Sequence, residues 1–282
     1  MAEMSKIKEA FGSLSNTEER HTTIDNAPVL LEEDEKVCGE IVCRTGLQCI
    51  DRDCGGIRDK ALTVLTGTSE SEVSTAILCI AYMCAFEEGK SVCIISSELA
   101  KEEIKERLLY FHTVLLYARG QTGKDASGEV EAALLGSRKQ GNIFIHECNV
   151  VPEQFRDTML GVVESHPDIK CIIVDGVDLL VNSTTDNKSR DICTLDQQGK
   201  LLAKQAEIGV VFTQFLKNDG MQAVRENRPI SLNDLTGGIG GYRYIDYCVC
   251  FNRDVTDDRS VKISTLKTRD TPGFNNVKLV FD

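Results

Sequence analysis

The chain has 282 residues and a formal net charge of −12. A chain of this length can bury a substantial core, and a composition that is 41% hydrophobic and 27% charged is that of an ordinary water-soluble globular protein. No apolar run approaches the roughly 20 residues of a membrane-spanning helix, and the N-terminus has no apolar signal-peptide core. These features predict a cytoplasmic protein with no membrane association.

The negative charge also restricts nucleic-acid binding. An acidic molecule repels phosphate as a whole, so a nucleic-acid site must rely on local cations or backbone amides.

Residues 1–37 are expected to form an N-terminal arm, and residues 38–282 the folded domain. Near the start of the arm, apolar residues recur at the spacing of a short amphipathic helix, namely Ile7, Ala10, Phe11 and Leu14. This apolar stripe has nothing local to cover it and is expected to dock on a neighbouring subunit. The acidic run at 32–35 is typical of a solvated linker.

From about residue 45, apolar strands alternate with amphipathic helices. The pattern predicts strands at 61–66, 91–96, 142–146, 170–174 and 208–213, helices at 73–86, 100–117, 129–135, 152–164 and 189–206, and closing strands at 247–252, 261–267 and 277–281. Strands that are almost wholly apolar are buried on both faces, which is typical of parallel sheets. We therefore expect an α/β fold with a mostly parallel sheet, helices on both faces and an antiparallel C-terminal extension.

The chain has twelve cysteines and no signal peptide, which indicates a reducing compartment. Four cysteines lie close together in the sequence and are a candidate metal site: Cys38, Cys43, Cys49 and Cys54. Zinc sites of four cysteines more often use pairs two to four residues apart. Thiols in a packed core are the favoured interpretation, and a metal site is the alternative.

The first strand runs directly into a helix through a loop with the length of a phosphate-binding P-loop, G-x-x-x-x-G-K-[ST]. The candidate nucleotide-binding residues are Gly67, Thr68, Ser69, Ser71, Ser74 and Thr75. Two positions depart from the motif, because Glu72 replaces the second glycine and Val73 replaces the lysine. The lysine supplies the cation for the β- and γ-phosphates, so its loss argues against phosphate binding.

Other strand ends carry polar residues, and ligands of such sheets sit at the carboxyl ends of strands. Glu98 is placed to activate a water molecule, Asp175 closes an apolar run in the manner of a Walker B aspartate, and Gln214 is placed to sense a phosphate. Lys267 and Arg269 lie two apart on an expected strand, so both should point to one face.

This order of features resembles the RecA-like P-loop NTPase motor domain of DnaB-family replicative helicases, which form hexameric rings. The segments that carry the resemblance are TGLQCIDRDCGGIRDKALTVLTG, SVCIISSELAKEEIKERLL, CIIVDGVDLL, IGVVFTQFLKN and LKTRDTP…VKLVF. The resemblance extends from about Thr45 to Phe281, a span of about five-sixths of the chain.

The resemblance implies ATP as substrate, Mg²⁺ held by Ser74 and Asp175, and Glu98 as the catalytic glutamate. It implies that Gln214 is the sensor and that Lys267 and Arg269 reach into a neighbouring subunit's ATP. It also implies single-stranded DNA as a partner and a ring, with the N-terminal helix joining adjacent subunits.

The DNA-contacting loop of the family normally carries charged residues, whereas here residues 233–235 are followed by the glycine-rich segment 236–241. Candidate cations for DNA are Lys188, Arg190, Lys217, Arg225, Arg228 and Arg243. Scattered surface charge is an equally good interpretation of these residues.

Three hypotheses follow. The first is an ATP-driven helicase motor acting in DNA replication. The second is a catalytically silent RecA-fold subunit, structural or regulatory, which donates Lys267 and Arg269 to an active helicase partner. The third is a RadA- or KaiC-like ATPase whose early cysteines bind metal.

Overall fold

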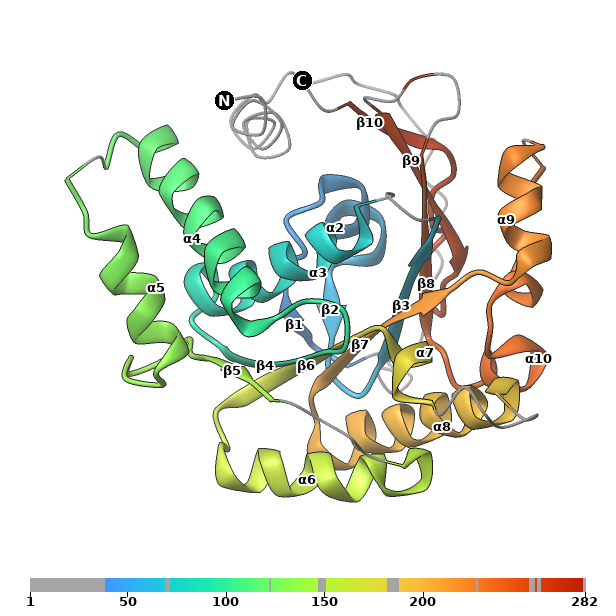
Figure 1. The fold of residues 1–282 in the computed structure, drawn as a ribbon, viewed down its shortest axis with the longest axis horizontal. Coiled ribbons are helices and arrows are strands. Elements are labelled where there is room, and N and C mark those ends of the chain that lie inside the picture. Colours follow the sequence, from blue (N-terminus) through green and yellow to red (C-terminus); the bar gives the residue numbers. More distant parts are fainter. Residues whose placement is uncertain are drawn as a thin grey trace, which may run out of the picture.

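The sheet at the centre of the molecule has eight strands, as the computed structural model of the chain shows (Figure 1). The structure describes residues 39–68, 72–121, 123–146, 151–181, 188–226, 228–253, 257 and 260–280, without the side chains of Arg225 and Val280. The expected arm at 1–37, Cys38, Ser69 and Ser71 lie outside the described residues.

The strands of this sheet are β3 (Leu62–Gly67), β4 (Ser91–Ser96), β5 (Ile143–Ile145), β6 (Ile169–Asp175), β7 (Gly209–Phe215), β8 (Tyr247–Arg253), β9 (Ser260–Lys267) and β10 (Val277–Val280). Their order is β10-β9-β8-β3-β7-β6-β4-β5. All pairs from β8 to β5 are parallel, and β9 and β10 add antiparallel strands at one edge. The predicted parallel sheet with an antiparallel C-terminal extension is confirmed.

Helices cover both faces of the sheet. The helices are α2 (Gln48–Cys54), α3 (Val73–Tyr82), α4 (Lys101–Ala118), α5 (Ala126–Leu134), α6 (Phe155–Ser165), α7 (Val177–Leu180), α8 (Lys188–Ala206), α9 (Asn218–Arg225) and α10 (Gly238–Gly241), with 3-10 turns at Pro152–Gln154 and Leu232–Asp234. In Figure 1, α6 and α8 lie below the sheet and α3 and α4 above it. Across the described ranges, none of these helices has the length and apolarity to cross a bilayer.

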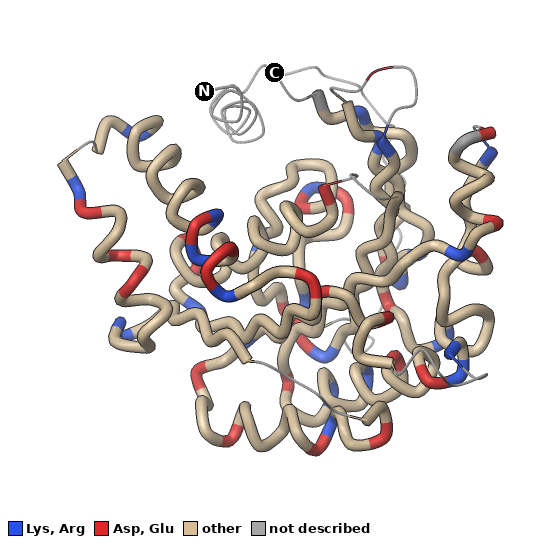
Figure 2. The backbone as a smooth tube through the Cα atoms, in the orientation of Figure 1, with Lys and Arg blue, Asp and Glu red and all other residues tan. Residues whose placement is uncertain are grey.

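The strand residues alternate between two apolar cores, one on each face. Leu62 and Val64 of β3 face the core under α6 and α8, whereas Leu65 faces the core under α2, α3 and α4. Figure 2 shows the strands as largely uncharged, with Lys, Arg, Asp and Glu placed mainly on helices and loops. Burial on both faces explains why the strands read as continuous apolar runs.

Two local features differ from the sequence prediction. A small antiparallel hairpin of β1 (Ile41–Cys43) and β2 (Ile57–Arg58) encloses α2 ahead of the main sheet. The helix expected at 73–86 is α3 followed by a π-helical turn, Met83–Glu87. Such short elements carry too few residues for a periodic pattern, and a π turn has no sequence signature of its own.

Three of the four early cysteines, Cys43, Cys49 and Cys54, are buried in the core under α2 and α3. Within the described residues, no group of three or more His, Cys, Asp or Glu side chains is placed to hold a metal ion. Burial raises the pKa of the Cys49 thiol to about 11, and a thiol that stays protonated is a poor metal ligand. The structure thus places these three thiols as small apolar side chains.

Candidate functional site

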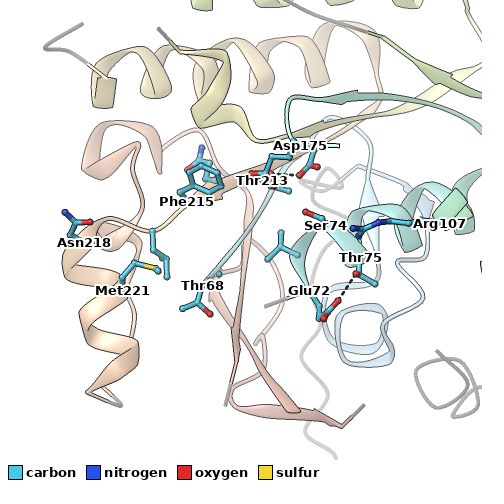
Figure 3. A pocket seen from close by; sticks show the side chains of 15 residues that line it. Thr68, Glu72, Ser74, Thr75, Arg107, Asp175, Thr213, Phe215, Asn218 and Met221 are labelled. Carbon is cyan, nitrogen blue, oxygen red and sulfur yellow. Dashed lines mark hydrogen bonds between the residues drawn. The ribbon is translucent and has the colours of Figure 1, made fainter. Parts of the chain in front are cut away.

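A cavity of about 540 Å³ opens at the carboxyl ends of the central parallel strands (Figure 3). It is lined by Gly67, Thr68, Glu72, Val73, Ser74, Thr75, Glu98, Arg107, Asp175, Thr213, Gln214, Phe215, Leu216, Asn218 and Met221. Strands β3, β7, β6 and β4 are neighbours in the sheet, so their ends meet here. The structure therefore brings the P-loop candidates that it describes into one cavity with Glu98, Asp175 and Gln214.

The first wall of the cavity is the entry to α3. Val73 begins the helix, and Ser74 and Thr75 of its first turn line the cavity. Glu72, just before the helix, has a left-handed backbone with φ of 67°, a conformation that favours glycine. This geometry explains why a glycine is usual there, and Glu72 adopts it while accepting a 2.7 Å hydrogen bond from Thr75 Oγ1.

Asp175 closes β6 at the floor of the cavity. It is 1% exposed and accepts hydrogen bonds from Thr213 Oγ1 at 3.1 Å and Ser96 Oγ at 3.2 Å. Ser96 lies directly opposite Asp175 in the parallel pairing of β4 with β6. Burial raises the pKa of Asp175, and the two hydroxyl donors act against that rise.

Glu98 follows the end of β4 and stands at the exposed edge of the cavity. Partial burial, and then the charges of Asp175 and Asp178, raise its pKa. Gly176 makes room for it, because a Cβ built on that residue would lie 3.3 Å from Glu98 Cγ. A carboxyl group of raised pKa beside another carboxylate is suited to accepting a proton from water.

Gln214, at the end of β7, is 2% exposed, and its amide donates to Asp196 Oδ1 on α8. Sequence reasoning missed Asp196, and also Asp178, a buried acid that accepts a 2.8 Å hydrogen bond from the Phe215 amide. The signal available for Asp196 was its helical spacing, four residues after Ile192 and three before Gly199, both of which are buried.

Arg107, in the second turn of α4, is another residue that sequence reasoning missed. Of the residues that line the cavity in the described part of the chain, it is the one cation. Figure 3 shows its side chain extending toward Ser74 and Thr75. Its Nη2 donates to Glu103 Oε1 at 2.7 Å, and its charge acts to lower the pKa of Asp175.

The opposite wall is apolar and comes from the end of β7 and from α9. Phe215, Leu216 and Met221 line it, together with Asn218. Figure 3 shows Phe215, Asn218 and Met221 across the cavity from the α3 side chains. The cavity is therefore two-sided, with hydroxyl and charged groups on one wall and an exposed aromatic ring on the other.

Lys267 and Arg269 do not reach this cavity. The sequence placed both on one strand, but β9 ends at Lys267, so Arg269 lies beyond the strand. Lys267 Nζ donates to the Tyr242 carbonyl at 2.6 Å, and Arg269 Nη1 donates to Asp246 Oδ1 at 2.6 Å. The two cations line a separate cavity of about 310 Å³ together with Lys200, Lys204, Arg243, Tyr244, Ile245 and Asp246.

The candidate DNA cations come from different elements. Lys217 Nζ donates to the Asn233 carbonyl at 2.9 Å, Arg228 is paired with Glu226 at 2.6 Å, and Arg243 lines the cavity of Arg269. Lys188 and Arg190 lie at the start of α8.

The glycine-rich segment 236–241 packs its backbone onto α8. A Cβ built on Gly241 would lie 2.2 Å from Asp196 Oδ2, so the close approach requires glycine. Ile239 of the same segment is 63% exposed.

A mostly parallel sheet of this order, with a strand–loop–helix cavity at its carboxyl edge, defines a RecA-like domain. The family model described as "DnaB-like helicase C terminal domain" matches residues 43–281. The chain belongs to this family, which separates it from the RadA- and KaiC-like alternative.

Individual relatives agree with this assignment. "Replicative DNA helicase DnaB" of Buchnera aphidicola subsp. Schizaphis graminum is 24% identical over 196 residues, which are 66% of this chain and 41% of the relative. The protein of the same description from Haemophilus influenzae is 24% identical over 219 residues, which are 74% of this chain and 46% of the relative. The chain thus spans less than half the length of these curated relatives.

Two solved structures share the fold. One, described as an ATPase domain, superposes with a TM-score of 0.64 at 19% identity, covering 82% of this chain and 85% of that one. "The Structure Of A DnaB-Like Replicative Helicase And Its Interactions With Primase" gives a TM-score of 0.68 at 18% identity, covering 89% of this chain and 63% of that one.

Proposed function

We propose that this chain is the motor domain of a replicative helicase, which binds ATP in the 540 Å³ cavity and uses its hydrolysis to move along single-stranded DNA as part of a hexameric ring. The observation that carries the proposal is the convergence of Glu98 and Asp175 beside the first turn of α3. Membership of the DnaB-like helicase family supports it.

The donor set of the cavity fits a phosphate-bearing ligand with a divalent cation. Ser74 offers a hydroxyl and Asp175 a carboxylate, and Mg²⁺ prefers such oxygen ligands. Bound there, Mg²⁺ would neutralise part of the charge of the phosphates. Thr68 Oγ1 is buried at the cavity without a hydrogen-bond partner, which supports a polar occupant.

The chain's own side chains would then divide the work. Glu98 would orient the attacking water and accept its proton, since its raised pKa suits a general base. Arg107 would supply the positive charge that Val73 cannot. Lys267 and Arg269, which do not line the 540 Å³ cavity of their own chain, would serve that cavity in a neighbouring subunit.

The test is ATP binding by calorimetry, followed by ATP hydrolysis with and without single-stranded DNA. We expect binding, and turnover that DNA stimulates and Glu98→Gln abolishes. Binding without turnover in the assembled oligomer would overturn the motor proposal. Loss of DNA stimulation on changing Lys188, Arg190 or Lys217 would assign the DNA-facing cations.

A second candidate is a catalytically silent subunit that donates Lys267 and Arg269 to an active helicase partner. Val73 in place of the P-loop lysine, with Glu72 beside it, is the observation that favours it. Micromolar ATP affinity of the isolated chain would exclude this candidate. Absence of ATP binding, together with stimulation of an active DnaB-type helicase that Arg269→Ala removes, would support it.

A further inference from the structure

The contact between Asp196 and Gln214 joins the nucleotide-binding cavity to the interior of the protein. Asp196 is 0% exposed, and its Oδ1 accepts a hydrogen bond from Gln214 Nε2. The second oxygen of each side chain, Asp196 Oδ2 and Gln214 Oε1, is buried and has no hydrogen-bond partner. Two buried acceptors without a donor would destabilise the folded state.

These two oxygens border the same point in the structure. A Cβ built on Gly237 would lie 2.8 Å from Asp196 Oδ2 and 3.7 Å from Gln214 Oε1. A carboxylate has only acceptors, whereas a protonated acid carries one O–H donor. One proton on Asp196 Oδ2 therefore satisfies both oxygens, because the acid can then donate to the amide carbonyl while its Oδ1 accepts from the amide N–H.

We propose that Asp196 is an uncharged acid that pairs with the Gln214 amide through two hydrogen bonds and so positions Gln214 in the cavity. The pair uses the amide carbonyl and one of the two amide hydrogens. Gln214 then presents a single N–H to the cavity, and this donor suits an anionic oxygen of a ligand. For a triphosphate ligand, this consequence rests on the proposed function.

The surroundings of Asp196 favour the uncharged form. Burial raises the pKa of Asp196 well above its usual range; the hydrogen bond from Gln214 acts against this rise, and the charge of Asp178 on α7 adds to it. Within the part of the chain that the structure describes, the thiols of Cys193 on α8 and Cys248 on β8 also interact with it. Lys200, one turn further along α8, is bonded instead to Asp246 and to the Lys60 carbonyl.

The same acid packs against the glycine-rich segment 236–241. Gly237 and Gly241 place backbone against Asp196 Oδ2, where any side chain would clash. Asp196 therefore lies between the cavity and the segment 236–241. A change in its pairing with Gln214 should alter the position of the Gln214 side chain in the cavity and the packing of that segment.

The main test is the pH dependence of stability, because a protonated buried acid has a raised pKa in the folded state. Above a pKa of about 3.9 the unfolded chain releases this proton, whereas the folded chain still holds it. The contribution of Asp196 to the free energy of unfolding is therefore complete at low pH and is lost as pH rises toward the folded pKa. Asn cannot titrate but keeps both hydrogen bonds. The equilibrium constant for unfolding of the wild type, divided by that of Asp196→Asn, should rise about tenfold per pH unit between the unfolded and the folded pKa of Asp196.

Urea unfolding from about pH 5 to about pH 8 measures this ratio. The exposed Asp219→Asn on α9 controls for the loss of one carboxyl group. Parallel pH profiles for wild type and Asp196→Asn would overturn the proposal. So would an Asp196→Asn chain that does not fold, since Asn reproduces the uncharged pair.

Infrared difference spectra of wild type and Asp196→Asn supply a direct signature. A protonated carboxylic acid band should be present at neutral pH in the wild type and lost in the variant. A carboxylate band lost in its place would overturn the proposal.

Calorimetry with ATP then tests the positioning role. Asp196→Ala should lower affinity about tenfold, and Asp196→Asn should restore it. Equal affinities of the Ala variant and the wild type would refute positioning. If the wild type binds no ATP, the proposed function fails, while the pH and infrared measurements still decide the state of Asp196.

Discussion

The Arg269 guanidinium donates a 2.6 Å hydrogen bond to Asp246 Oδ1, while Lys200 donates to Oδ2 of the same carboxylate. Asp246 also accepts a 2.8 Å hydrogen bond from the Leu62 amide at the start of β3. One buried acid thus joins a long helix, a central strand and the segment that carries Arg269.

We expect Asp246→Asn to lower the free energy of unfolding by about 3–5 kcal/mol, because it leaves the Lys200 ammonium buried without its carboxylate. Urea denaturation measures the loss. The double variant Lys200→Met with Asp246→Asn should recover much of it, since no buried cation remains. A double variant as unstable as the single one would show that the loss has another origin.

Arg107→Ala is expected to weaken ATP binding about ten- to hundredfold, the range for losing one charged hydrogen bond. The physical reason is that Arg107 is the cation that lines the cavity in the described residues. Calorimetry measures the affinity, with Arg156→Ala on α6 as a control for lost charge. Glu103→Gln, which removes the ion-pair partner of Arg107 at 2.7 Å, should not weaken binding. Unchanged affinity in Arg107→Ala would remove Arg107 from the phosphate site.

Glu72→Gly combined with Val73→Lys should raise ATP affinity, since it removes a carboxylate from the entry of α3 and restores the P-loop cation. Stability should change little. Relief of the left-handed backbone at Glu72, about 1–2 kcal/mol, offsets the lost hydrogen bond from Thr75, about 0.5–1.5 kcal/mol. Calorimetry and urea denaturation check the two statements. A variant that folds but gains no affinity would mean that the loop cannot hold phosphate even with the motif restored.

The pH dependence of hydrolysis should report Glu98. A base must be ionised, so the rate should fall as pH drops through the raised pKa of Glu98. Asp178→Asn removes one of the charges that raise this pKa and should move the acidic limb of the pH–rate profile to lower pH. The exposed Glu153→Gln serves as the control. Superimposable profiles for wild type and Asp178→Asn would indicate that another group controls the acidic limb.

The main sheet and most of its helices could be predicted from the sequence, because strands such as β3 and β6 are apolar runs closed by polar residues. The hairpin of β1 and β2 could not, since two and three residues are too few for a pattern. Arg107 and Asp196 lie on helices, and which face of a helix meets the cavity depends on tertiary packing. Gly199, with a Cβ position 2.5 Å from Phe212 Cζ, allows the close approach of α8 to the sheet, which only the structure shows.

The two ends of β3 carry different parts of the chemistry. Leu62 at one end binds the acid that holds Arg269, and Gly67 at the other end lines the cavity. The two residues are five steps apart on the strand, which at about 3.3 Å per step separates them by about 17 Å. If Arg269 serves such a cavity within a ring, it is that of the next copy, and the contact is head-to-tail between unlike surfaces. Contacts of this kind leave an unmatched surface at each end of an open chain of subunits, and only a closed ring removes both.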